Sequence, residues 1–150
     1  MTKLQIGDKA PDFKGIDQNG SVLSFSDFKG KKLVLFFYPK DNTPGCTEEA
    51  CNLRDNYSGF QQKGYEVVGI SKDSDKSHMN FISKYNLPFN LISDTEKKII
   101  NDYGVWGEKI MYGKKIEGLH RTTFIISEKG IIENIITKVD TKNHAVQIFK

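Results

Sequence analysis

Two cysteines are the residues of this chain best suited to chemistry, and they lie five positions apart. Cys46 and Cys51 are the only cysteines among the 150 residues. An apolar run precedes them and breaks at Pro39, where a loop containing proline and glycine leads into a polar, helix-favouring segment. A strand that delivers a thiol to the first turn of a helix is a common way to make a reactive sulfur. Cys46 is therefore the first candidate for a nucleophile or a redox-active group.

Cys46 falls in the first turn of an expected helix. Thr43 or Asn42 can cap this helix, and Pro44 suits its first position. The unpaired backbone N–H groups of a first turn, together with the positive end of the helix dipole, favour a thiolate. An ordinary cysteine with a pKa of about 8.5 is only a few per cent ionised at pH 7. A pKa lower by about two units raises the thiolate fraction on the order of twentyfold.

The neighbouring charges oppose ionisation of Cys46. Glu48 and Glu49 follow it closely and disfavour a second negative charge. A nearby cation is therefore needed, and Lys40 is the one local candidate in the preceding loop. We expect the cation to come from a distant part of the chain.

The spacing of the two cysteines constrains how they can react together. On an intact α-helix, residues five positions apart have Cα atoms about 8.7 Å apart and about 140° apart around the axis. A disulfide requires a Cα separation of at most about 7 Å. If Cys46 forms a sulfenic acid that Cys51 attacks, the helix must therefore unwind locally.

Other interpretations of the cysteines remain open at this point. They can be two half-buried, inert side chains on a helix. A metal site is less well supported, because a five-residue cysteine spacing is not a usual zinc pair and His78, His120 and His144 show no ligand spacing. We expect neither a metal nor a cofactor.

Composition indicates one ordinary globular domain covering residues 1–150. Charged residues make up 27% of the chain and are well mixed, and the net charge is only +3, so we do not expect nucleic-acid binding. The longest strongly apolar run, 33–38, is far shorter than the roughly 20 residues of a membrane span. The N-terminus lacks an apolar signal region, so a cytoplasmic location is expected.

The expected elements alternate between strands and helices. Residues 32–38 are apolar without alternation, which is typical of a strand buried on both faces of a parallel or mixed sheet. Residues 7–20 are expected to form a loop, and the glycine-rich segment 105–119 is left unassigned. The other expected strands are 21–24, 65–71, 91–93, 122–127 and 131–137. The expected helices are 43–62, 74–85, 94–104 and 141–149, with Asp73 or Ser74 as the cap of the second and Asp94 as the cap of the third. This order predicts an α/β fold of the thioredoxin-like arrangement, with a central mixed β-sheet flanked by α-helices.

The segment 38–51, Tyr-Pro-Lys-Asp-Asn-Thr-Pro-Gly-Cys-Thr-Glu-Glu-Ala-Cys, closely resembles the peroxidatic motif of peroxiredoxins. The form is that of the Q-type group, the bacterioferritin comigratory proteins. Its core is a proline, three residues, a threonine, two residues and a cysteine, with a second cysteine five positions on. Further similarities to the family occur at 7–13, 104–107, 121–124 and 143–145. The resemblance thus extends over nearly the whole chain.

The resemblance implies a role for five residues. Cys46 would attack a hydroperoxide, and Thr43 would hydrogen-bond at the peroxide and the thiolate. Pro39 would shield the site, and Arg121 would be the missing cation. Cys51 would resolve the sulfenic acid to an intramolecular disulfide that thioredoxin, or a similar dithiol reductant, then reduces. The resemblance also favours a monomer.

Simpler interpretations exist for the same residues. Thr43 alone can be a helix cap, Pro39 a strand stop and Arg121 a surface charge. His120, beside Arg121, is not needed as a base by a thiolate that is already ionised. A thiol–disulfide oxidoreductase normally uses Cys-x-x-Cys, which is absent here. The remaining alternative is a non-enzymatic binding module with a thioredoxin-like fold.

Overall fold

The computed structural model describes residues 2–149, which form nine strands, five α-helices and one short 3-10 helix. The strands are β1 (Lys14–Ile16), β2 (Val22–Ser24), β3 (Lys32–Phe37), β4 (Tyr65–Ser71), β5 (Asn90–Ser93), β6 (Trp106–Met111), β7 (Lys114–Leu119), β8 (Thr122–Ile126) and β9 (Ile132–Ile136). The helices are η1 (Phe25–Phe28), α1 (Pro44–Asp55), α2 (Tyr57–Gln62), α3 (Asp75–Tyr85), α4 (Lys98–Asp102) and α5 (His144–Phe149).

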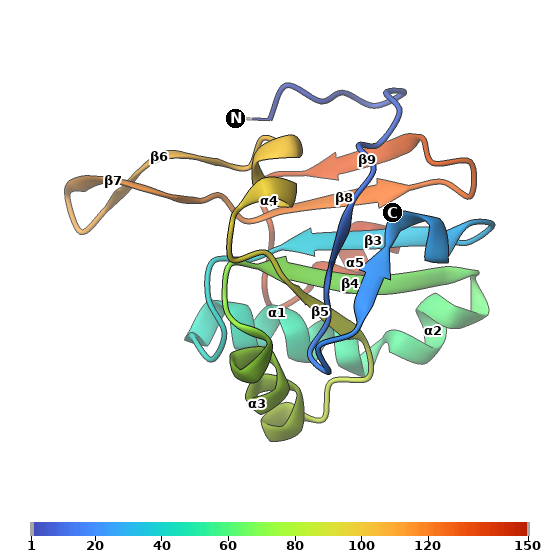
Figure 1. The fold of residues 1–150 in the computed structure, drawn as a ribbon, viewed down its shortest axis with the longest axis horizontal. Helices are drawn as coiled ribbons and strands as arrows, with labels where there is room; N and C mark the ends of the chain where they lie inside the picture. The colour runs from blue at the N-terminus through green and yellow to red at the C-terminus, as the bar shows by residue number, and fades with distance from the viewer. Residues whose placement is uncertain (1, 150) are drawn as a thin grey trace.

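Seven of the strands form one mixed sheet in the order β2-β1-β5-β4-β3-β8-β9 (Figure 1). The central pairs β3–β4 and β4–β5 are parallel, whereas β8 runs antiparallel to β3. Strands β6 and β7 form a separate hairpin that projects from the body of the molecule (Figure 1). The sheet and its flanking helices confirm the predicted mixed α/β architecture.

Strand β3 lies inside the sheet, between β4 and β8, and is buried on both faces. Because successive side chains of a strand point to opposite faces, β3 contributes to two apolar clusters. One cluster includes residues of η1 and α4, and the other includes residues of α1, α2, α3 and α5. The strand contributes Leu33, Leu35 and Phe37 to the first cluster. It contributes Val34 and Phe36 to the second cluster, which also contains Tyr38, the residue after the strand.

Several elements differ from those expected from the sequence. The helix expected to reach Gln62 is divided at Asn56, whose side-chain amide donates to the Asn52 carbonyl oxygen. The segment 7–20 contains the short strand β1, and the unassigned segment 105–119 forms the β6–β7 hairpin. In both cases the strand is formed by pairing with a neighbouring strand, which the propensity of the single segment does not report.

Helix caps were predicted with mixed success. Ser74 caps α3, since its hydroxyl accepts a hydrogen bond from the Ser77 N–H. The expected cap Asp94 lies further upstream: the N-cap residue of α4 is Lys97. Asp94 instead accepts a hydrogen bond from the Ile100 N–H inside the helix.

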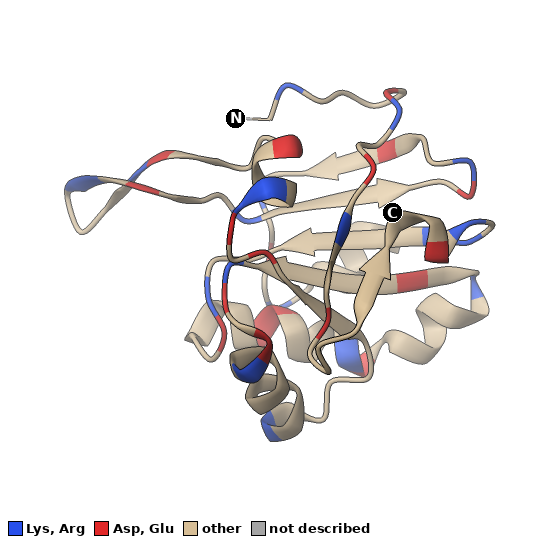
Figure 2. Cartoon of the chain, viewed as in Figure 1, with Lys and Arg blue, Asp and Glu red and all other residues tan. Residues whose placement is uncertain are grey.

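Charged residues are distributed over many elements of the chain rather than gathered on one (Figure 2). This mixture agrees with the small net charge of +3. None of the helices in residues 2–149 combines the length and apolar character needed to cross a membrane.

Candidate active site

The pairing of β3 with β8 brings Arg121 to the end of β3. The two strands are antiparallel, with Phe37 opposite Thr122. Arg121 directly precedes β8, so it lies beside the point where the chain leaves β3. The segment that follows, residues 38–43, connects β3 to α1 and is called the active-site loop below. The distant cation expected for Cys46 is therefore positioned by sheet register.

Helix α1 carries Cys46 in its first turn, as the sequence predicts. Pro44 is the first helical residue, and Thr43 occupies the N-cap position with extended backbone angles. The Thr43 hydroxyl does not accept a hydrogen bond from the first turn; it donates to the Lys40 carbonyl oxygen at 2.8 Å. Cys46 is buried, with 1% of its surface exposed. The Thr43 side chain thus leaves the N–H groups of the first turn, in which Cys46 lies, without a side-chain cap.

The Arg121 guanidinium lies against the first turn of α1. Its Nη2 atom is 3.2 Å from the position that a Cβ would take on Gly45, next to Cys46. Burial alone would lower the pKa of Arg121, but the Glu49 carboxylate and the Cys46 sulfur raise it. Arg121 therefore remains charged and favours the thiolate of Cys46.

The Glu49 carboxylate holds Arg121 in place through an ion pair. This side chain is fully buried one turn after Cys46, and its Oε1 accepts a hydrogen bond from Arg121 Nη1 at 2.7 Å. Its Oε2 has no hydrogen-bond partner among the described residues and lies 3.5 Å from His144 Nε2. Burial raises the pKa of Glu49 to about 7, although Arg121 opposes this shift.

His144 explains why Glu49 Oε2 is left without a partner. Burial lowers the pKa of His144, which therefore favours the neutral ring. Its Nδ1 donates to the Gln147 side-chain oxygen at 2.8 Å, so its Nε2 can accept from the Thr123 hydroxyl at 2.7 Å. A neutral ring arranged in this way offers no donor to Glu49, which agrees with the raised pKa of that carboxyl.

The second cysteine does not reach the first in this conformation. Cys51 is half-buried, both thiols are free, and α1 is unbroken between them. Near Cys51, the Asn52 side chain donates to the Lys142 carbonyl oxygen and accepts from the Ala145 N–H. Joining the two sulfurs therefore requires α1 to unwind and loosens its contact with α5.

The structure brings Thr43, Cys46 and Arg121 together at one end of the sheet. Pro39 is the second residue of the active-site loop and is half-buried. The sequence predicts Glu49 only as a charge that opposes the thiolate, whereas in the structure it is the hydrogen-bond partner of Arg121. Glu49 lies three residues after Cys46 on the same helix face. This spacing is the signal that could have identified Glu49 as a partner of the cation expected beside Cys46.

The chain is similar to known proteins along nearly its whole length. Residues 6–135 match the model of the AhpC/TSA family. A putative peroxiredoxin bcp of Coxiella burnetii is 48% identical over 145 residues, which cover 97% of this chain and 96% of that protein. Peroxiredoxin Bcp of Escherichia coli K12 is 42% identical over 144 residues, covering 96% and 92% of the two chains.

Solved structures show the same fold. A cysteine-to-serine mutant of PrxQ from Xylella fastidiosa matches with a TM-score of 0.92 and 32% identity, covering 99% of this chain and 94% of that chain. The Xanthomonas campestris bacterioferritin comigratory protein, studied for alkyl peroxide reduction, matches with a TM-score of 0.87 and 33% identity over 99% and 94%. These matches confirm the thioredoxin-like arrangement. The chain belongs to the AhpC/TSA family as a peroxiredoxin of the Bcp type, and it is a thiol peroxidase.

Proposed function

We propose that Cys46 is the peroxidatic nucleophile and that Arg121 is the cation that activates it. The observation that carries this proposal is the guanidinium of Arg121, held by Glu49 against the first turn of α1 beside a buried Cys46. The helix N-terminus and the guanidinium both stabilise a thiolate. Lys40, the local alternative, is exposed.

The first step oxidises Cys46. Its thiolate attacks one peroxide oxygen, so that an S–O bond forms and the O–O bond breaks. The other oxygen leaves and takes up a proton, as an alcohol from an organic hydroperoxide or as water from hydrogen peroxide. Arg121 stabilises the charge that develops on these oxygens, and the Thr43 hydroxyl turns from the Lys40 carbonyl oxygen to donate a hydrogen bond to them. Pro39 shields the sulfur from water. The sulfur is left as a sulfenic acid.

The second step is resolution by Cys51. After α1 unwinds, the Cys51 thiol attacks the sulfenic sulfur, water leaves and an intramolecular disulfide forms. A dithiol reductant of the thioredoxin type then supplies two electrons and returns both thiols. A thiol–disulfide oxidoreductase would instead need two thiols within disulfide reach of each other, a geometry that the unbroken α1 does not offer.

We propose hydrogen peroxide and organic hydroperoxides as substrates, and a cytoplasmic monomer as the active form. The reported work on alkyl peroxide reduction in the Xanthomonas relative supports the organic class of substrate. Light scattering of the reduced protein tests the monomer, for which the expected mass is 17.1 kDa.

A coupled assay tests the residue roles. With thioredoxin, thioredoxin reductase and NADPH, we expect peroxide-dependent NADPH oxidation, which Cys46→Ser abolishes. Cys51→Ser should consume about one equivalent of peroxide and stop as a sulfenic acid that mass spectrometry detects. Undiminished turnover in Cys46→Ser would refute the nucleophile, and sustained turnover in Cys51→Ser would remove Cys51 as the essential resolver.

A further inference from the structure

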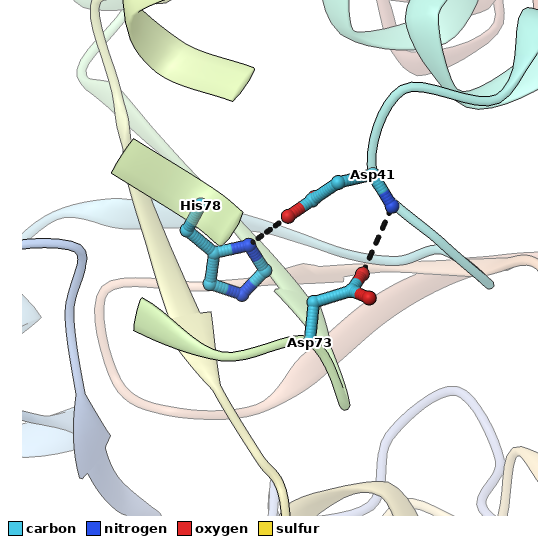
Figure 3. A group of neighbouring side chains, drawn as sticks. All are labelled: Asp41, Asp73 and His78. Atoms are coloured by element: carbon cyan, nitrogen blue, oxygen red, sulfur yellow. Dashed lines mark hydrogen bonds and ion pairs between the residues drawn. The ribbon is translucent and has the colours of Figure 1, made fainter. Parts of the chain in front are cut away.

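A buried polar cluster lies outside the Cys46 site, against the active-site loop. It joins Asp41 of that loop, His78 of α3 and Asp73 from the turn between β4 and α3 (Figure 3). One side-chain atom from each residue lies within 4.8 Å of the others. The side chains of His78 and Asp41 are 0% and 2% exposed. The loop that leads to the reactive thiol is therefore tied to a part of the fold outside α1.

Asp41 has a partner for every group it presents to this cluster. Its Oδ1 accepts from the Tyr38 hydroxyl at 2.6 Å, and its Oδ2 accepts from the Ser77 hydroxyl at 2.8 Å. The His78 Nδ1 atom lies 2.8 Å from the same Oδ2. The backbone N–H of Asp41 donates to Asp73 Oδ2 at 2.9 Å (Figure 3). These contacts hold both the backbone and the side chain of one loop residue.

The contact between Asp41 and His78 is a buried hydrogen bond. The Nε2 atom of His78 faces the Ile92 carbonyl oxygen at 3.0 Å, and a carbonyl oxygen can only accept, so Nε2 carries a proton. A second proton must lie between Nδ1 and the carboxylate, because two acceptors would repel at 2.8 Å. Removal of either partner leaves a buried polar group unsatisfied, which is costly.

Two carboxylates and an imidazole are also side chains that bind metal ions. Here, however, the facing atoms are engaged by protein groups. Asp73 Oδ2 already accepts from the Ser71 hydroxyl and from the Asp41 N–H, and His78 has partners on both nitrogens. The geometry therefore assigns the cluster to holding the loop rather than to a metal.

The path from Asp41 to the helix is itself constrained. Asn42 has a φ of 61°, the left-handed conformation that asparagine tolerates better than most residues. The next residue, Thr43, donates its hydroxyl to the Lys40 carbonyl oxygen. Because this turn has little freedom, the position of Asp41 determines where Pro44 and the first turn of α1 begin.

We propose that Asp41 is a positioning residue of the peroxidase reaction, resting on the function proposed above. It fixes the active-site loop against β4 and α3, so that Thr43 and Cys46 meet Arg121 when α1 is folded. When α1 unwinds for disulfide formation, Asp41 remains in place and provides the fixed end from which the helix re-forms. Because Asp41 keeps the loop ordered while α1 is unwound, less conformational entropy is lost when the helix re-forms, and Asp41 thereby favours the folded conformation that reacts with peroxide.

This role predicts a split between the two chemical steps. Asp41→Ala should lower the second-order rate of Cys46 oxidation about tenfold, since small displacements of reacting groups cost up to about a hundredfold. The rate of disulfide formation from the sulfenic acid should stay the same or rise, because the folded helix is no longer favoured. Single-turnover mixing with hydrogen peroxide measures the first rate in a Cys51→Ser background and the second with Cys51 present.

Two further variants keep the test decisive. Ser77→Ala removes one hydrogen bond to Asp41 and should shift the rates in the same direction by a smaller factor. Asp17→Ala is the matched control: Asp17 is 8% exposed and accepts from the Asn19 and Ser21 N–H groups in the turn between β1 and β2. This control should lower the thermal midpoint and leave both rates unchanged.

Specific outcomes would overturn the positioning role. The role is overturned if Asp41→Ala, like Asp17→Ala, lowers the thermal midpoint and leaves both rates unchanged. It is also overturned if Asp41→Ala slows Cys46 oxidation and disulfide formation by the same factor. If Asp41→Ala does not fold, an unchanged oxidation rate in Ser77→Ala overturns it. A parent protein whose Cys46 does not consume peroxide at all would instead refute the proposed function, so the two failures are distinct.

Discussion

At the scale of single residues, Gly45 leaves the space in which the Arg121 guanidinium lies. A Cβ on Gly45 would be 3.2 Å from Arg121 Nη2, closer than most such contacts. Gly45→Ala should therefore displace the guanidinium by a few tenths of an ångström without disturbing the helix, since alanine is the better helix former. We expect the rate of Cys46 oxidation by peroxide to fall, by up to about a hundredfold. Stopped-flow mixing of the reduced protein with peroxide measures this rate.

Gly59→Ala is the control for this substitution. Gly59 lies inside α2, and nothing lies within 4 Å of the position that its Cβ would take. The change should leave the oxidation rate unaltered and stabilise the protein by about 0.5–1 kcal/mol. Equal rates for Gly45→Ala and the parent protein would mean that Arg121 can move without loss of catalysis.

The residues of the site divide into those that the sequence could predict and those that it could not. Cys46 and Thr43 follow from local helix-start signals, and Arg121 follows from the family motif. The partners of Asp41 could not be foreseen, because His78 is 37 positions away and no short-range pattern reports that a histidine will be buried against an aspartate. Such pairings depend on which polar residues the sheet brings together.

At the scale of elements, the buried carboxyl of Glu49 lowers the stability of helix α1 when it ionises. Glu49 is buried, and its folded-state pKa of about 7 lies above the ordinary value of 4.5. The protonated carboxyl therefore contributes stability that is fully present below about pH 4.5 and is lost as the pH rises through about 7. At about 1.4 kcal/mol per pKa unit, the loss is on the order of 3 kcal/mol. Ionised Glu49 thus favours unwinding of α1.

This charge predicts a pH dependence of stability. In a Cys46→Ser, Cys51→Ser background, which removes thiol titration, the free energy of unfolding should fall by roughly 1 kcal/mol as the pH rises from 6.5 to 8 and then level off, because most of the loss occurs between the two pKa values of Glu49. Glu49→Gln should flatten this slope, because the amide does not ionise. Burial lowers the pKa of His144, and that histidine contributes stability that is lost only as the pH falls below about 6.5, outside the chosen window. Denaturant titrations at each pH measure the slope.

The control for this prediction is Glu48→Gln. Glu48 is the exposed neighbour of Glu49, and its Oε1 accepts a hydrogen bond from the Thr141 hydroxyl. Its substitution should leave the slope parallel to that of the parent protein. If Glu49→Gln also keeps the parental slope, the buried carboxyl does not take up a proton in this range and α1 is not weakened by its charge.

The elements that the sequence predicts well are those with strong local signals. The segment 32–38 is apolar throughout, and β3 ends within one residue of the expected position. The segment 105–119 mixes charged residues with glycine, and only the pairing of Trp106 with Leu119 and of the residues between them makes it a hairpin. Its strands pair with each other rather than with the main sheet, so no buried face imposes a clear alternation.

At the scale of the whole molecule, the sheet is extended past β5 by a strand that the sequence did not predict. Strand β1 is only three residues long, with Gly15 at its centre, and glycine is depleted in strands. The structure supplies the reason for the glycine. A Cβ at position 15 would lie 2.5 Å from Ile92 Cγ2 and 3.3 Å from Ile99 Cδ1. Gly15 therefore permits β1 to approach β5 and α4 closely.

Gly15→Ala consequently tests the packing of the whole fold apart from its chemistry. Ile92 is fully buried, and its Cγ2 is attached next to the backbone, so it cannot move aside without shifting β5. Overpacking of this kind costs about 1–3 kcal/mol, which for a chain of this size lowers the thermal midpoint by roughly 2–4 °C per kcal/mol.

Because two strands, β5 and β4, separate β1 from β3, the rate of Cys46 oxidation in Gly15→Ala well below the midpoint should equal that of the parent protein. Calorimetry and single-turnover mixing measure the two quantities. An unchanged midpoint would show that β1 is free to shift, and a slower oxidation would show that the edge of the sheet is coupled to the active site.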